Sequence, residues 1–222
     1  MSSYSEEDLR IKSSVLGSVG TNCYFIYHEQ TRKAVIIDPA AQADYIIKQC
    51  TELGIEPEAV LLTHGHADHM LAAEKIRTHY GIPVIAGEKE KEVLENPSMN
   101  LSPMISGQQV GIKADQLVRD GDVLELIGFS FQVIETPGHT EGSVCYWIEM
   151  AGVLFAGDTL FEESFGRTDF PTGSVSALAR SIVDKLFVLP EDTIIYSGHG
   201  AETSIGREKR YNPIYHYGGG MQ

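Results

Sequence analysis

The stretch Thr63–Met70 reads THGHADHM, and half of its side chains are potential metal ligands. Residues 58–62, just before it, form a short apolar run typical of a buried strand, whereas residues 70–77 return apolar side chains at helical spacing. The stretch therefore lies at a strand-to-helix junction. Its candidate ligands are His64, His66, Asp68 and His69.

The spacing within this stretch predicts two pairs of ligands. His64 and His66 are two positions apart on extended backbone, so their side chains project to the same side. Asp68 and His69 fall at the start of the helix, where they could hold a second, neighbouring ion. Imidazole and carboxylate together suit zinc, and also iron or manganese, so the ligand set alone does not choose the metal. The alternative is a polar turn that happens to be rich in histidine, and the HxHxDH spacing at a strand end argues against it.

Length and composition indicate one globular domain, which we expect to span residues 1–222. Hydrophobic residues make up 42% of the chain, which is enough for a sizeable core. The formal charge is −14, from 17 basic and 31 acidic residues, and it repels phosphate backbones. We therefore expect a small-molecule substrate and no nucleic-acid partner.

The cysteines and the first residues indicate the compartment. Cys23, Cys50 and Cys145 are widely separated and form no CxxC pair, so neither a disulfide framework nor a cysteine zinc site is expected. The N-terminal MSSYSEEDLRIK is acidic, whereas a signal peptide is basic and then apolar. No apolar run reaches the length of a membrane span. We expect a soluble, cytoplasmic protein, as a monomer or a homodimer.

Local patterns along the chain predict a mixture of strands and helices, with two β-rich portions packed together. Apolar or β-branched runs predict strands at residues 10–16, 22–27, 34–37, 58–62, 83–86, 123–127, 129–135, 143–148, 152–156 and 193–197. Helical spacing predicts helices at residues 43–53, 71–80, 88–95 and 175–187, of which 88–95 has the charges of a surface helix. Residues 98–114 lack periodicity, and we expect a long loop there with room for about one helical turn.

Three more polar groups follow apolar strands and are flanked by glycines that let the backbone approach an ion closely. They are His139 in TPGHTEGS, Asp158 in AGDT and His199 in GHG. Together with Thr63–Met70 they bring the candidate ligands to seven. Each lies where a predicted strand ends.

In their order along most of the chain, these motifs resemble the metallo-β-lactamase superfamily. The resemblance implies an α+β fold, a single-domain four-layer αββα sandwich with a metal site at one edge of its two sheets. THGHADH, GDTLF at 157–161 and GRTDF at 166–170 are most similar to the glyoxalase II group, in particular to its short bacterial members that lack the helical glutathione-binding domain. Persulfide dioxygenases share much of the same signature.

The resemblance also implies a role for each candidate ligand. The first metal would be held by His64, His66 and His139, the second by Asp68, His69 and His199, with Asp158 as the bridge between them. Two such ions share a water and lower its pKa from near 16 towards about 7, which provides hydroxide at neutral pH. Asp68 would both bind metal and orient this hydroxide, as the catalytic residue.

The function we expect is hydrolysis of a thioester such as S-lactoylglutathione or a related small acyl thioester, because the second metal can receive a thiolate leaving group. A persulfide dioxygenase with one iron on His64, His139 and Asp158 is the closest alternative. A lactonase or another ester hydrolase of the same fold is a further one, since the hydroxide does not itself select the carbonyl. A metal-stabilised binding domain without turnover is the non-enzymatic reading.

Several residues outside the ligand set are candidates for supporting roles. Asp38 closes an apolar strand, where it either accepts a hydrogen bond from a metal-binding histidine or simply starts a turn before proline. Arg167 and Asp169 are expected to form a supporting ion pair, with Arg167 also a candidate for substrate contact. Asn22 is expected to pack in the core. His28 matches no motif and is expected at the surface.

The region after His199 offers little for glutathione. It holds 23 residues, interrupted by Gly206, Asn212-Pro213 and Gly218–Gly220, so it cannot form a helical domain. Its only basic cluster is Arg207, Lys209 and Arg210, which we interpret as a solvated helix face. We therefore expect thioester hydrolysis to depend only weakly on the glutathione portion.

Overall fold

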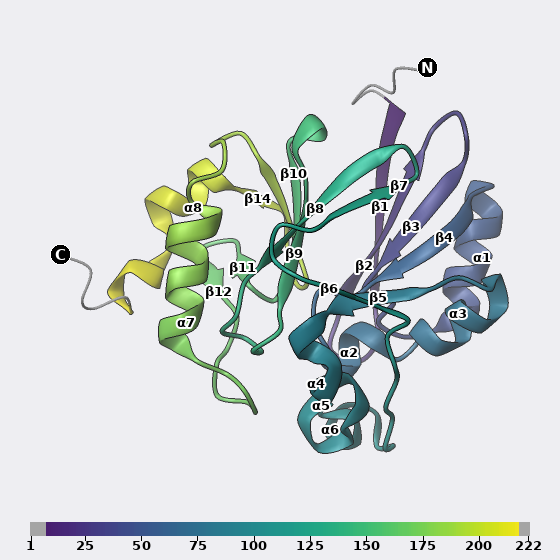
Figure 1. Ribbon diagram of the computed structural model, residues 1–222, viewed down its shortest axis with the longest axis horizontal. Coiled ribbons are helices and arrows are strands. Elements are labelled where there is room, and N and C mark those ends of the chain that lie inside the picture. Colours follow the sequence, from purple (N-terminus) through teal and green to yellow (C-terminus); the bar gives the residue numbers. More distant parts are fainter. Residues whose placement is uncertain (1–7, 218–222) are drawn as a thin grey trace.

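The structure is a computed structural model that describes residues 8–217. Two six-stranded sheets pack face to face, and helices cover both outer faces (Figure 1). The α+β fold is therefore the four-layer αββα sandwich that the motifs predicted. No helix in residues 8–217 combines the length and the apolar character needed to cross a membrane.

The first sheet has the strand order β1-β2-β3-β4-β5-β6. Its strands are β1 (Leu9–Leu16), β2 (Thr21–His28), β3 (Lys33–Ile37), β4 (Glu56–Leu61), β5 (Val84–Gly87) and β6 (Gln116–Val118). The first three strands form an antiparallel meander, and the remaining pairs are parallel. The helices α1 (Ala43–Leu53) and α3 (Ala73–Tyr80) cover its outer face (Figure 1).

The second sheet has the order β14-β13-β10-β9-β8-β7. Its strands are β7 (Val123–Leu126), β8 (Phe129–Glu135), β9 (Val144–Ile148), β10 (Val153–Gly157), β13 (Ile194–Ser197) and β14 (Thr203–Ser204), with the 3-10 turn η3 (Glu149–Ala151) between β9 and β10. Its outer helices are α7 (Val175–Arg180), which continues as the π-helical turn η4 (Ser181–Leu186), and α8 (Ile205–Tyr211), followed by η5 (Pro213–His216). The short strands β11 (Leu160–Phe161) and β12 (Ser164–Phe165) form a separate two-stranded sheet.

The pleat of the strands divides the core into three layers. In β3, Val35 and Ile37 face the space between the sheets, whereas Ala34 and Ile36 face α1 and α3. Both faces of this strand are covered, which explains why its sequence is a continuous apolar run without alternation. The third layer fills the space between the second sheet and α7.

Three local predictions were incomplete. Residues 98–114 are not one long loop, because they include most of the short helix α5 (Pro97–Asn100) and all of α6 (Ser102–Ser106). The predicted helix 71–80 is preceded by a separate turn, α2 (Ala67–Met70), and the predicted helix 88–95 is divided into η2 (Glu88–Glu90) and α4 (Lys91–Glu95). Proline in the first turn marks the start of both α5 and α6.

The prediction for His28 was wrong. Its side chain is buried, and its ring lies 5.8 Å from that of Phe129 between centroids. Its Nδ1 accepts hydrogen bonds from the backbone of Gln30 and Thr31 at the turn after β2. The residue is part of the inter-sheet structure and lies outside the candidate site.

Candidate metal centre

The seven predicted ligands lie together at one edge of the sandwich. Each follows the end of a strand, so the sheets themselves bring the ligands to a common edge. His64 and His66 follow β4, Asp68 and His69 belong to α2, and His139, Asp158 and His199 follow β8, β10 and β13. The two halves of the chain therefore both contribute to the centre.

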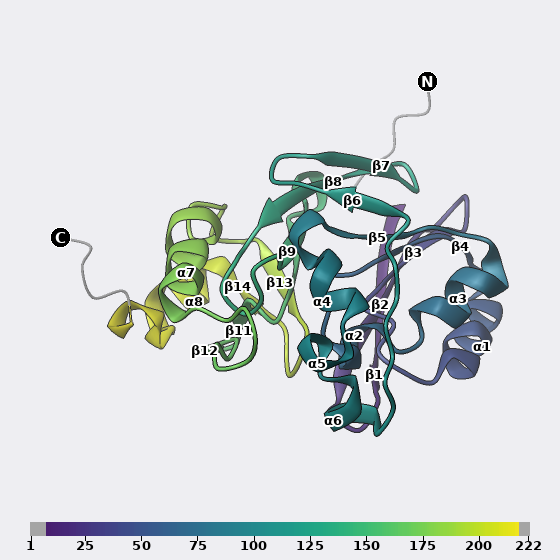
Figure 2. The same ribbon diagram turned by 60° about the horizontal axis from the view of Figure 1, so that its bottom comes forward.

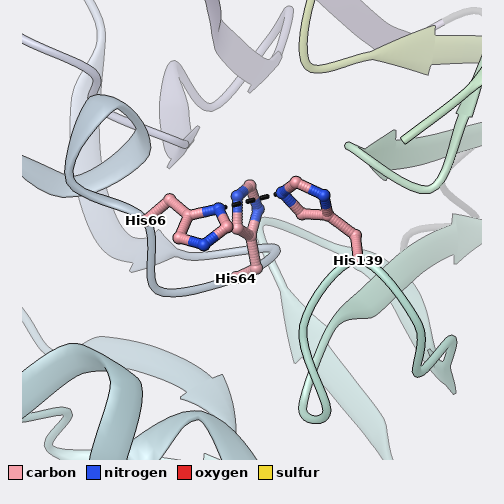
Figure 3. A group of neighbouring side chains, drawn as sticks. All are labelled: His64, His66 and His139. Carbon is pink, nitrogen blue, oxygen red and sulfur yellow. Dashed lines mark hydrogen bonds between the residues drawn. The ribbon is translucent and has the colours of Figure 1, made fainter. Parts of the chain in front are cut away.

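The ligands form three overlapping groups, and within each group the ligand atoms lie within 4.8 Å of one another. The first is His64, His66 and His139, whose ring nitrogens point towards a common space (Figure 3). The second is His64, His69 and Asp158, and the third is Asp68, His69 and His199. The first and third groups have the membership that was predicted for the two metals.

Asp158 lies between these groups. Its Oδ1 is 3.4 Å from Nε2 of His69, and its Oδ2 is 3.6 Å from Nε2 of His139 and 3.5 Å from Nε2 of His199. One carboxylate thus faces histidines of both predicted metal sites. This is the position that a bridging ligand needs.

The Nδ1 atoms of three ligand histidines are occupied by acceptors at the periphery of the site. Nδ1 of His69 is 2.9 Å from Oδ2 of Asp38, which also accepts from the backbone and hydroxyl of Thr63. Nδ1 of His139 lies 2.7 Å from the carbonyl oxygen of Arg167, and Nδ1 of His199 lies 3.2 Å from that of Gly20. Such contacts fix the tautomer and direct Nε2 to the centre.

These contacts also show what the predicted supporting residues bind. Asp38 accepts from a ligand histidine, so it does more than start a turn. The predicted ion pair is confirmed, because the guanidinium of Arg167 binds both carboxylate oxygens of Asp169, at 2.7 and 2.6 Å. The pair is exposed, and the contact of Arg167 with the centre is made by its backbone.

The donor atoms fit divalent metal ions. Within residues 8–217, Nε2 of His64, His66 and His69 and Oδ1 of Asp158 are buried without a hydrogen-bond partner. A buried polar atom without a partner costs about 1–3 kcal/mol, so a cluster of them needs a compensating ligand. Imidazole nitrogen and carboxylate oxygen are the donors that zinc, iron and manganese accept.

The electrostatics of the site hold His66 and Asp158 in the protonation states that metal ligands require, whereas the neighbouring carboxylates raise the pKa of His69 and of His199. Burial, together with the neighbouring His139, lowers the pKa of His66 to about 3, so this imidazole is neutral. Burial alone would raise the pKa of Asp158, but the surrounding histidines, His69 foremost, together outweigh burial and lower that pKa to about 2. A neutral imidazole and an ionised carboxylate both bind metal without first losing a proton.

Glu90 is a supporting residue that the sequence did not reveal. It is fully buried, and its carboxylate accepts hydrogen bonds from the backbone of Gly65 at 2.8 Å and of Gly142 at 3.0 Å, and from the hydroxyl of Thr140. It therefore connects the loop that carries His64 and His66 to the loop after His139. Glu90 lies in a run of charged residues, EKEKE, so no local signal separates it from its exposed neighbours.

Asn22 also has a different role from the predicted one. It is buried, as expected for a core position, but its amide donates to the carbonyl oxygens of Ser197 at 2.9 Å and Gly200 at 3.1 Å. Its backbone N–H donates to Gly198 at 2.7 Å. Asn22 thus holds the loop of His199 from the start of β2.

Comparison with known proteins agrees with this geometry. Residues 16–199 match the family model of the metallo-β-lactamase superfamily. The chain is 38% identical over 200 residues to a probable metallo-hydrolase, YqgX, of Bacillus subtilis, covering 90% of this chain and 94% of that protein. It is also 38% identical over 195 residues to the hydroxyacylglutathione hydrolase GloC of Haemophilus influenzae, covering 87% and 92%.

Solved structures show the same relationship. The BLEG-1 B3 metallo-β-lactamase has a TM-score of 0.88 at 40% identity, over 92% of this chain and 99% of that chain. ETHE1 from Myxococcus xanthus has a TM-score of 0.76 at 33% identity, over 92% and 83%. TTHA1623 in a di-iron-bound form has a TM-score of 0.80 at 30% identity, over 91% and 99%. The chain belongs to the metallo-β-lactamase superfamily, and it is a metal-dependent hydrolase of that superfamily.

Proposed function

We propose that the protein hydrolyses small acyl thioesters with two divalent metal ions, for which zinc is the first choice. The observation that supports this most directly is the position of Asp158, whose carboxylate faces histidines of both ligand groups. GloC, a relative of similar length, is named a hydroxyacylglutathione hydrolase, which makes S-lactoylglutathione the first substrate to test. Three buried, free cysteines agree with a cytoplasmic location.

When bound, the ions supply an acidified water and a Lewis acid for a carbonyl oxygen. In the reaction, the water oxygen bonds to the carbonyl carbon, the C–S bond breaks, and the sulfur leaves with the electron pair and is released as a thiol beside a carboxylic acid. Asp68 lies in the floor of the cavity above the ligands, where its carboxylate can hold a proton of the water. The hydroxyl of Thr21 donates to Oδ2 of Asp68 at 2.9 Å and fixes its orientation.

The experiment combines metal analysis of the purified protein with a thioester hydrolysis assay. The Asp158→Ala variant should lose both ions and the activity, because it removes the only carboxylate placed between the two groups within residues 8–217. The matched control, Asp192→Ala, removes an exposed carboxylate that belongs to none of the three ligand groups and should retain both the ions and the activity. Full hydrolysis after exhaustive chelation would contradict the proposal.

A persulfide dioxygenase is the second candidate function. His64 and His139 lie with Asp158 in the same cluster, and such a two-histidine, one-carboxylate face is typical of mononuclear iron oxygenases. The di-iron-bound relative shows that iron binds to a closely similar fold. A single iron per chain, with oxygen consumption on glutathione persulfide and no thioester hydrolysis, would favour this function over the first.

A further inference from the structure

The cavity above the metal centre has two apolar walls. Its volume is about 550 Å³, and ligand residues such as His66 and Asp158 form its floor. One wall, which we call the aromatic wall, consists of Phe161, Phe165 and Phe170 from the second half of the chain. The other, the aliphatic wall, consists of Val19 from the β1–β2 turn, Leu101 between α5 and α6, and Met104 and Ile105 from α6. A substrate on the ligands would therefore lie between hydrocarbon surfaces.

The aliphatic wall is built by segments that project beyond the sheets. The helices α5 and α6 extend from the same end of the molecule as the β1–β2 turn (Figure 2). Val19 and Ile105 also share the lining of a second, smaller cavity of about 170 Å³ beside Asp68. The turn and α6 therefore meet over the metal ligands, although they are far apart in sequence.

Two features of the aliphatic wall are unusual for a purely structural element. Val19 and Met104 are 50% and 66% exposed, so much of their apolar surface is open to a ligand. Leu101, between α5 and α6, has a φ of 64°, a left-handed conformation that costs a leucine about 1 kcal/mol and that glycine or asparagine would adopt more easily. A leucine is present there despite this strain, and its side chain lines the cavity.

The charges of the cavity do not suit an anionic substrate. Arg167 is the only lysine or arginine among the residues that line it, and its guanidinium is bound to Asp169 and lies 3.9 Å from the ring centre of Phe170. The basic cluster on α8 is also engaged, since Arg207 pairs with Glu163 and Lys209 with Glu191. The two carboxylates of glutathione would find no unpaired lysine or arginine among the described residues that line this cavity.

We propose that the cavity selects thioesters whose acyl group is an apolar chain, and that the aliphatic wall is the element that recognises this chain. The inference rests on the proposed thioester hydrolysis and adds the class of substrate to it. Each methylene that leaves water for the aliphatic wall should tighten binding about threefold to fourfold until the chain reaches the end of the wall. S-lactoylglutathione, the first substrate to test, would then be hydrolysed with a lower kcat/KM than thioesters of apolar acyl chains.

The first test measures binding without turnover. Thioether analogues of N-acetylcysteamine, which is a small neutral thiol, would carry alkyl chains of increasing length from ethyl to octyl. Titration calorimetry on the metal-loaded protein should show the dissociation constant falling about threefold to fourfold per methylene over the first members of the series. A dissociation constant that does not change with chain length, or that rises, would overturn the inference, whether or not the protein hydrolyses thioesters.

The second test uses two exposed methionines as a matched pair. Met104→Lys places a cation on the aliphatic wall, and Met150→Lys places one at the 57% exposed position of η3, away from the cavity. Met104→Lys should flatten the dependence on chain length and improve the relative affinity for anionic ligands, whereas Met150→Lys should behave as the unmodified protein. Equal behaviour of the two variants would show that the aliphatic wall does not recognise the chain.

The third test is kinetic and separates this inference from the proposed function. The kcat/KM of acyl-N-acetylcysteamine thioesters, from acetyl to octanoyl, should rise with chain length in parallel with the affinities. Hydrolysis without this rise, or a preference of a hundredfold or more for S-lactoylglutathione, would defeat the inference and leave the proposed function intact. No hydrolysis of any thioester would defeat the proposed function, and the calorimetric series would still decide whether the cavity binds apolar chains.

Discussion

A Cβ atom on Gly198 would lie 2.2 Å from Oδ1 of Asp158. It would also lie 2.8 Å from Cε1 of His69. Neither distance is compatible with a non-bonded contact, so the glycine backbone itself forms part of the wall behind the ligands. The space that the two ligands occupy exists only because residue 198 has no side chain.

The variant Gly198→Ala should therefore lose metal. The added methyl group would overlap the carboxylate of Asp158. This carboxylate would then have to leave its position between the two ligand groups. We expect less than the full complement of metal in elemental analysis of the purified variant. Gly54→Ala is the control, because Gly54 has a positive φ and open space around its Cβ position. This substitution should lower the free energy of unfolding by about 1 kcal/mol without contacting the site. Equal metal content in both variants would contradict the prediction.

Asp38→Asn should weaken metal binding without removing it. Asp38 accepts from Nδ1 of His69 and from two groups of Thr63, and an amide can replace only part of this acceptor set. Its φ of 50° is tolerated by asparagine as well as by aspartate, so the backbone should not change. Loss of such a contact lowers metal affinity about 10- to 100-fold, which competition with a chelator measures. The control, Asp44→Asn, changes an exposed carboxylate and should leave the affinity unchanged.

Glu90 should make stability depend on pH. Burial raises its pKa from 4.5 to about 7, so the folded protein holds this proton more tightly than the unfolded chain does. The resulting stabilisation is fully present below about pH 4.5 and is lost as the pH rises through 7, a change of about 3 kcal/mol. Glu90→Gln removes this titration. The free energy of unfolding of the unmodified protein, relative to that of the variant, should therefore decrease between pH 5 and pH 8. Urea unfolding of both proteins at these pH values measures this decrease. A difference in the free energy of unfolding that stays constant with pH would contradict the raised pKa of Glu90.

Arg167→Ala should retain the metal. The group that orients His139 is the carbonyl oxygen of residue 167, which the substitution keeps, and the side chain pairs with Asp169 at the surface. Exposed ion pairs contribute little to stability because water and salt screen them. Metal content and unfolding midpoint should both stay close to those of the unmodified protein. Loss of metal would show that the guanidinium supports the site directly.

The ligand residues were predictable because each follows an apolar strand closely in the sequence. An apolar run followed by a histidine or an aspartate flanked by glycine is a local pattern, and the strand end then fixes the position of the side chain. The αββα layers and the metal role of each ligand were implied by the resemblance of these motifs, in their order along the chain, to the metallo-β-lactamase superfamily.

The supporting roles of Glu90 and Asn22 were not predictable because their partners are distant in sequence. Glu90 bonds to Gly142, which is 52 positions away, and Asn22 bonds to Gly200, which is 178 positions away. Neither pairing leaves a mark on the local pattern, so a buried glutamate looked like a surface charge and a buried amide looked like ordinary packing. The helices α5 and α6 were missed for a related reason, since four or five residues are too few to show a helical period.

The bonds from Asn22 to the loop of His199 have a consequence for how the protein is made. Chains fold during synthesis beginning with the N-terminal part, and β2 is available long before residues 197–200 leave the ribosome. Until then, the first ligand group is complete in sequence, whereas the group of Asp68, His69 and His199 lacks its last member. On the proposed two-ion function, a nascent chain would acquire at most one well-ligated ion, and the second would enter after β13 has docked. Metal supplied during translation and metal supplied afterwards would then fill the two proposed sites differently.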